Sequence, residues 1–101
     1  MKVINIIIPT YNEEDNIIRL IKNIKKFIPK ALITIVDDSL NYRIGTLIKK
    51  NRFTKVKYFH RKNSKGRGSA VLFGLKKQFR NDENHIFIEM DADFSHTPNE
   101  L

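Results

Sequence analysis

The feature that most constrains this fold is the regular alternation of short apolar segments with amphipathic ones. The apolar segments are four to six residues long and rich in β-branched residues, and they occupy residues 3–8, 32–36, 56–59 and 86–90. Such runs are typical of buried strands, and the segments between them carry apolar residues at helical spacing. We therefore predict the order β-α-β-α-β-α-β and the fold class α/β, with a three-layer, mainly parallel, Rossmann-like sheet. In such a sheet a ligand is expected beyond the carboxyl ends of the strands.

The first strand and the helix after it show how the boundaries are predicted. Pro9 has no N–H for a ladder hydrogen bond, so the strand is expected to end there. Asn12 is a candidate N-cap, and acidic residues follow it in the first helical turn, where they favour the positive end of the helix dipole. Apolar residues at helical spacing predict the helix body, and they are Ile17, Leu20, Ile21, Ile24, Phe27 and Ile28.

Length and composition limit the protein to one domain over residues 1–101. The chain has 101 residues, no cysteine and a formal net charge of +8. The lack of cysteine excludes a disulfide framework and fits a reducing compartment. No apolar run approaches the roughly 20 residues that span a bilayer. We therefore expect a soluble cytoplasmic protein with an anionic partner, and charge alone does not choose between nucleotide phosphate, nucleic acid and an acidic membrane surface.

Two acids follow the last apolar run. Asp91 and Asp93 are separated by one residue, so they share a face if the extended backbone continues. Two carboxylates so placed repel each other unless a cation lies between or beside them. A divalent metal that carries substrate phosphates is one resolution, since Mg²⁺ takes one or two protein carboxylates. A solvated turn after the strand is the alternative.

The turn after the first strand excludes two common nucleotide sites. A dinucleotide fold requires G-x-G-x-x-G there and a P-loop requires G-x-x-x-x-G-K-[ST], whereas residues 9–13 read Pro-Thr-Tyr-Asn-Glu. Gly66 and Gly68 lie later, at the start of the third predicted helix, with basic residues nearby: Arg61, Lys62, Lys65 and Arg67. These glycines are compatible with backbone N–H groups that bind a diphosphate, and equally with a helix that packs closely on the sheet.

Four motifs in order along nearly the whole chain resemble a known family. They are Ile-Pro-Thr-Tyr-Asn-Glu at 8–13, Val-Asp-Asp at 36–38, Gly-Arg-Gly-Ser-Ala at 66–70 with Gly74, and Met-Asp-Ala-Asp-Phe-Ser-His-Thr-Pro at 90–98. The chain resembles the nucleotide-sugar-binding half of a family 2 glycosyltransferase with the A-type fold. The subgroup that it resembles most is the polyprenyl-phosphate (dolichyl-phosphate) mannosyltransferases, because Ser-His-x-Pro follows the paired acids.

The resemblance implies a donor site made by the first two turns. Pro9, Tyr11 and Glu13 would contact the base and ribose, with Tyr11 stacking and Glu13 accepting hydrogen bonds from sugar hydroxyls. Val36 would contact the base through its backbone, and Asp38 through hydrogen bonds. Structural roles remain the alternatives: a strand end for Pro9, a half-buried anchor for Tyr11 and a first-turn acid for Glu13.

The resemblance also assigns the paired acids. Asp91 and the backbone of Ala92 would approach the ribose and phosphate, and Asp93 would ligate Mg²⁺ or Mn²⁺ that bridges the diphosphate. Asp91 and Asp93 are thus the implied catalytic residues. The implied reaction is metal-dependent, inverting transfer of a sugar, mannose in this subgroup, from a nucleotide-diphosphate donor such as GDP-mannose to polyprenyl phosphate. Such an acceptor would place the protein peripherally at the cytoplasmic face of a membrane.

Two departures from the family pattern bear on activity. Residues 39–43 read Ser-Leu-Asn-Tyr-Arg, where the family has a turn rich in Gly, Ser and Asp with a further acid. The sequence also ends at Leu101, whereas a whole domain of this family has about as much again. We therefore expect a chain truncated at its C-terminus, for which the missing C-terminal half is a partner, and we do not expect turnover by this chain alone.

Three other functions are alternatives for this sequence. A sugar-nucleotidyltransferase is disfavoured because the first turn lacks a Gly-rich basic loop. A basic nucleic-acid-binding domain would explain the charge of +8, but the aromatic residues do not alternate with the basic ones as a stacking platform requires. A catalytically inactive fragment or assembly module that keeps the fold is the third alternative.

Overall fold

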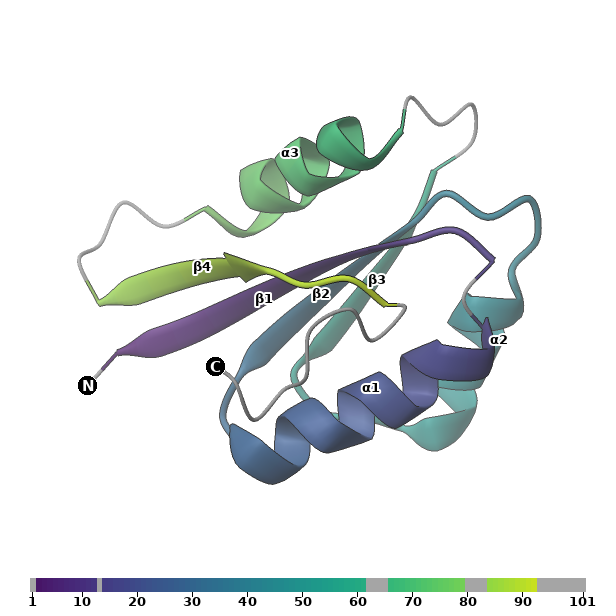
Figure 1. Cartoon of the computed structure of the whole chain (residues 1–101). Coiled ribbons are helices and arrows are strands. Elements are labelled where there is room, and N and C mark those ends of the chain that lie inside the picture. Colours follow the sequence, from purple (N-terminus) through teal and green to yellow (C-terminus); the bar gives the residue numbers. More distant parts are fainter. Residues whose placement is uncertain (1, 13, 62–65, 80–83, 93–101) are drawn as a thin grey trace.

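The structure is a computed structural model that describes residues 2–12, 14–61, 66–79 and 84–92. It contains the predicted elements in the predicted order (Figure 1). The strands are β1 (Val3–Thr10), β2 (Leu32–Asp37), β3 (Val56–His60) and β4 (His85–Glu89). The helices are α1 (Glu14–Phe27), α2 (Arg43–Asn51) and α3 (Arg67–Gln78). The α/β fold class is therefore confirmed.

The four strands form one sheet in the order β3-β2-β1-β4, and every pairing is parallel. The register places Thr10 beside Asp37, and Asp37 beside His60. On the other side of β1, Ile7 lies beside Glu89 of β4. The carboxyl ends of the strands thus meet at one edge, and the strand order reverses between β1 and β4. Such a reversal leaves a crevice beyond the strand ends, where ligands bind in open α/β sheets.

Helices cover both faces of the sheet, as predicted for a three-layer fold. Figure 1 shows α1 and α2 on one face and α3 on the other. The core on the α1 and α2 face is almost entirely aliphatic, and its fully buried members include Ile6, Ile8, Ile17, Leu20, Ile21, Ile24, Ile33, Ile35 and Ile44. On the other face α3 lies very close to β1, because a Cβ at Gly74 would be 2.7 Å from Cγ2 of Ile7. Among the helices that the structure describes, none combines the length and the apolar character needed to cross a bilayer.

Two predictions at the end of β1 were wrong. The strand continues through Pro9 to Thr10. The carbonyl of Ile7 accepts from the N–H of Met90, so the hydrogen-bonding groups of Ile7 point toward β4. Pro9, two residues later, points to the same side, but pairing between β1 and β4 ends at Ile7 and Glu89. Its missing N–H therefore breaks no ladder bond. Asn12 is not the N-cap, because α1 begins at Glu14 and Asn12 has a left-handed backbone with φ 55°, whereas N-cap residues are typically extended.

Candidate functional site

Three turns that were predicted to form the site lie side by side at the carboxyl edge of the sheet. The amide of Asp38 donates to the carbonyl of Thr10 at 2.9 Å, and the amide of Met90 donates to the carbonyl of Ile7 at 3.0 Å. Pro9 lies beside Val36 in the β1–β2 register. Segments 9–12, 36–39 and 90–92 are therefore adjacent in space although up to 83 residues separate them in the sequence.

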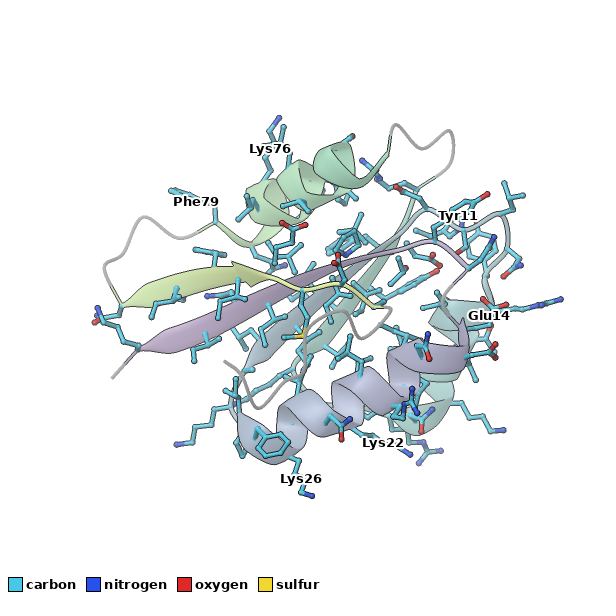
Figure 2. The ribbon with its side chains drawn as sticks, viewed as in Figure 1. Tyr11, Glu14, Lys22, Lys26, Lys76 and Phe79 are labelled. Atoms are coloured by element: carbon cyan, nitrogen blue, oxygen red, sulfur yellow. The ribbon has the colours of Figure 1, made fainter. Side chains whose placement is uncertain are left out.

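Tyr11 presents an exposed ring at this edge. It follows β1 directly, is 53% exposed, and lies beyond the strand ends near the start of α1 (Figure 2). The next residue, Asn12, donates its backbone N–H to Oγ of Ser39 at 2.7 Å, so the turn after β1 is tied to the turn after β2. An exposed aromatic face can stack on a planar base. Glu13, the other predicted residue of this turn, lies outside the described residues.

Val36 and Ala92 are both buried. Val36 is fully buried, and its Cγ2 lies 3.2 Å from the place that a Cβ at Gly74 would occupy. Ala92 is 2% exposed. Their side chains are therefore part of the packed interior, and contact with a ligand is limited to their backbones, which is the kind of contact that the resemblance implies for both.

Asp38 is held by an arginine. Nε and Nη2 of Arg61 donate to the two carboxylate oxygens of Asp38, each at 2.7 Å, and both side chains are largely buried. Nη1 of Arg61 donates to Oγ of Ser69 in α3 at 2.9 Å. The Asp38 carboxylate raises the pKa of Arg61, as a bidentate carboxylate does when it stabilises the charged form. The pair therefore links the end of β2 to the first turn of α3.

The carboxylate of Asp37 is a second polar centre, buried beneath the turns. Asp37 is fully buried, and Oδ1 accepts from Oγ1 of Thr10 and from the amide of Ser39, both at 3.0 Å. Oδ1 also accepts from Oγ of Ser39, and Oδ2 accepts from Oη of Tyr58, both at 2.5 Å. Burial, followed by the hydrogen bond to Asp37, raises the pKa of Tyr58 above its usual value. The two adjacent acids therefore have separate partners.

Of the paired acids, the structure describes Asp91, which is half-buried and follows β4. Asp93, the predicted metal ligand, lies outside the described residues. In the described ranges, no group of three or more His, Asp or Glu side chains is placed to hold a metal ion. The carboxylate of Asp91 is nonetheless a hard oxygen donor at the switch point, which is the type of donor that Mg²⁺ and Mn²⁺ take.

The glycines at the start of α3 were expected either to present backbone N–H groups to a diphosphate or to allow close packing on the sheet. Gly66 has φ 97°, a left-handed conformation that favours glycine. A Cβ at Gly68 would meet no described atom within 4 Å, so close packing does not explain this glycine. The close approach is at Gly74 instead. Of the basic residues near these glycines, Arg61 bonds to Asp38, and Lys62 and Lys65 lie outside the described residues.

The partners of the two acids are not among the residues that the sequence predicts for the site. The sequence predicts Tyr58 only as a strand residue and Arg61 only as one of several basic residues near the glycines. One signal was present: an aspartate at the end of a buried parallel strand must find hydrogen-bond donors inside the protein. Tyr58 was a candidate donor, but it lies 21 residues away from Asp37 in the sequence, and only the strand register brings the two together.

Comparison with known proteins identifies the family of the chain. The sequence profile of glycosyl transferase family 2 matches residues 5–101. Polyprenol monophosphomannose synthase of Mycolicibacterium smegmatis is 34% identical over 95% of the chain and 37% of its own length. Dolichol-phosphate mannosyltransferase of Pyrococcus furiosus is 34% identical over 97% of the chain and 27% of its own length. Undecaprenyl-phosphate mannosyltransferase of Micrococcus luteus is 29% identical over the whole chain and 42% of its own length. The chain thus spans less than half the length of these relatives, and it belongs to glycosyl transferase family 2.

Proposed function

We propose that the chain forms the nucleotide-sugar-binding part of a glycosyltransferase that moves mannose from a nucleotide-diphosphate donor to a polyprenyl phosphate. The observation that supports this most is the meeting of the turns after β1, β2 and β4 at the switch point, which brings Tyr11, Asp38 and Asp91 to one edge. The mannosyl and polyprenyl parts of the proposal are supported by the printed functions of the relatives. The acceptor side of the cleft is assigned to the C-terminal half of a longer protein.

In this proposal the turns at the carboxyl edge of the sheet bind each part of the donor. The ring of Tyr11 stacks on the base, and Asp38 accepts hydrogen bonds from it. Asp38 already receives both nitrogens of Arg61, but each carboxylate oxygen keeps a further acceptor position. Glu13 accepts from the ribose hydroxyls. Asp91 and the backbone of Ala92 would contact the ribose and the first phosphate.

We further propose that the donor is bound together with a divalent cation, because family 2 glycosyltransferases generally use one. The carboxylate of Asp93 is the hard donor that would hold Mg²⁺ or Mn²⁺, and Asp91 would place a second negative charge near the cation. When bound, the cation supplies a Lewis acid that stabilises the negative charge of the departing diphosphate. The chain contributes by holding the donor so that its sugar faces the acceptor.

The proposed reaction is an inverting displacement at the anomeric carbon. An oxygen of the polyprenyl phosphate forms the new bond to this carbon. The bond between the anomeric carbon and the diphosphate oxygen breaks, and its electron pair leaves with the nucleoside diphosphate. The acceptor oxygen is already anionic, so it needs no general base of the strength that a sugar hydroxyl requires. The inversion is tested by NMR of the product's anomeric configuration. A lipid acceptor would hold the protein at the cytoplasmic face of a membrane.

Nucleotide binding tests the donor site directly. GDP, UDP, GDP-mannose and UDP-glucose are titrated into the chain by calorimetry and thermal shift, each with Mn²⁺ and with EDTA. We expect selective binding that EDTA weakens at least tenfold. Asp93→Ala should weaken it similarly, because the proposed carboxylate ligand of the cation is lost. Asp15→Ala is the matched control, since Asp15 is an exposed acid in the first turn of α1.

Other results would support other functions. If a folded chain binds none of these nucleotides, the donor-site proposal is wrong for this chain. Binding of an oligonucleotide that weakens steeply with salt and ignores EDTA would support the nucleic-acid alternative. Donor binding without turnover in a protein that includes the C-terminal half would support an inactive assembly module.

A further inference from the structure

We propose that Asp37 is a positioning residue of the donor site: through Thr10, Ser39 and Tyr58, its buried carboxylate fixes the turns after β1 and β2 that present Tyr11 and Asp38. The inference rests on the proposed function, because it concerns how the same site is held. Asp37 itself is fully buried, so its carboxylate would act through its hydrogen-bond partners.

Several hydrogen-bond donors converge on the buried carboxylate of Asp37. Asp37 receives hydrogen bonds from Thr10 at the end of β1, from the amide and hydroxyl of Ser39 after β2, and from the hydroxyl of Tyr58 on β3. A buried carboxylate is stable only when donors replace the water that it has lost. Each donor therefore has a strong preference for one position, and three adjacent strands are held in register at their carboxyl ends.

Ser39 connects the Asp37 carboxylate to the turn after β1. Its hydroxyl donates to Asp37 and accepts from the backbone N–H of Asn12 at 2.7 Å. Asn12 has φ 55°, a conformation that residues other than glycine adopt rarely, although asparagine tolerates it best. Asn12 directly follows Tyr11, so the bond from Ser39 determines how the chain turns after the proposed stacking residue.

The ring of Tyr58 packs directly against α2. A Cβ at Gly45 would lie 2.6 Å from Cε2 of the Tyr58 ring, so the ring rests directly on the glycine backbone. The raised pKa of Tyr58 means that the hydroxyl keeps its proton, and hence its role as donor, throughout the neutral pH range. The network thus runs from α2 through β3 to the turns of the site.

Asp37 and Asp38 divide two tasks between neighbouring residues. Successive residues at the end of a strand point to opposite faces. Asp37 points toward Tyr58 and α2, and Asp38 points toward Arg61 and α3. The hydrogen bonds of Asp37 hold the backbone at the end of β2, and this keeps the carboxylate of the next residue, Asp38, at the carboxyl edge of the sheet.

The test removes single hydroxyl groups and measures both order and affinity. Tyr58→Phe and Ser39→Ala each delete one hydroxyl and keep the rest of the side chain, while Ser39→Thr restores a hydroxyl. Tyr42→Phe is the matched control, because Tyr42 is 55% exposed and is not among the donors to Asp37 in the described chain. For each variant, the Asn12 amide resonance is followed in a ¹⁵N–¹H spectrum, and GDP and UDP with Mn²⁺ are titrated by calorimetry.

We expect Tyr58→Phe and Ser39→Ala to weaken binding of the preferred nucleotide about tenfold, the effect of losing about 1.4 kcal/mol. The Asn12 amide resonance should move in Ser39→Ala and return toward its wild-type position in Ser39→Thr. A purely structural role would lower the melting temperature and leave affinity below that temperature unchanged. Wild-type binding by both hydroxyl-deletion variants would overturn the inference and leave the donor site intact. A folded wild type that binds neither nucleotide would instead overturn the proposed function, and with it the positioning role.

Discussion

Arg61 and Asp38 form a bidentate ion pair in which both N–O distances are 2.7 Å, and the exposed fractions of the two side chains are only 14% and 7%. The pair joins the turn after β2 to the end of β3, and Ser69 extends it to α3. Burial makes the interaction sensitive to the loss of either partner, because a carboxylate left alone in a largely buried place is poorly solvated.

Removal of Arg61 should therefore destabilise the fold strongly. We expect Arg61→Ala to lower the free energy of unfolding by about 3 kcal/mol, since breaking a buried pair leaves an uncompensated charge. Urea denaturation at pH 7 measures the change. The matched control is Arg43→Ala, which breaks a 3.5 Å pair with Glu14 in which the Arg43 side chain is 71% exposed, and such exposed pairs contribute about 0.5 kcal/mol. Equal effects of the two substitutions would contradict the prediction.

Gly45 should not tolerate a methyl group. In Gly45→Ala the new Cβ would lie 2.6 Å from the Tyr58 ring, so the ring must move and its bond to Asp37 lengthens. Overpacking of this kind lowers the free energy of unfolding by about 1–3 kcal/mol. Gly68→Ala is the control, because its Cβ would meet no described atom within 4 Å. In α3 we expect it to stabilise by about 0.5 kcal/mol, and a loss of stability there would show that the clash is not the cause at Gly45.

Tyr58 should make the fold sensitive to alkali. Its pKa is raised in the folded protein by burial and by the bond to Asp37. Above pH about 10, the unfolded chain loses the tyrosine proton while the folded chain keeps it. The contribution of Tyr58 is thus fully present below that pH and is lost as pH rises further. The fall in unfolding free energy from pH 8 to pH 11, measured with urea, should be larger in wild type than in Tyr58→Phe; identical falls would refute this.

Lys25 and Lys55 should repel each other in the folded state. Burial and, to a smaller extent, the charge of Lys55 lower the pKa of Lys25, so folding disfavours its charged form. The penalty is present below the folded pKa and disappears as pH rises toward the ordinary lysine value. Lys55→Gln should raise the free energy of unfolding at pH 7 by about 0.3 kcal/mol, and the gain should shrink in high salt. Lys50→Gln, at an exposed position on α2, is the control.

The order and type of the elements could be predicted because local periodicity determines them. Ile6 and Ile8 face one side of β1, while Ile7 faces the other against α3, so an almost continuously apolar run indicated a strand covered on both faces. The apolar spacing of Ile17, Leu20 and Ile24 likewise matched the buried face of α1. The strand boundary at Pro9 could not be predicted, because it depends on where β4 stops pairing with β1.

The sequence by itself determined the alternation of strands and helices and the placement of the Tyr11, Asp38 and Asp91 motifs after strands, since hydrophobic periodicity and turn residues act over a few neighbouring positions. Only the tertiary structure decided that Asp37 is the buried carboxylate bound by Tyr58 and that Asp38 pairs with Arg61. The physical reason is that Tyr58 lies on β3 and Arg61 directly follows it, 21 and 23 residues further along the chain than the acids that they bind. Parallel strand pairing brings them to the same edge, and burial then requires each carboxylate to find a donor there.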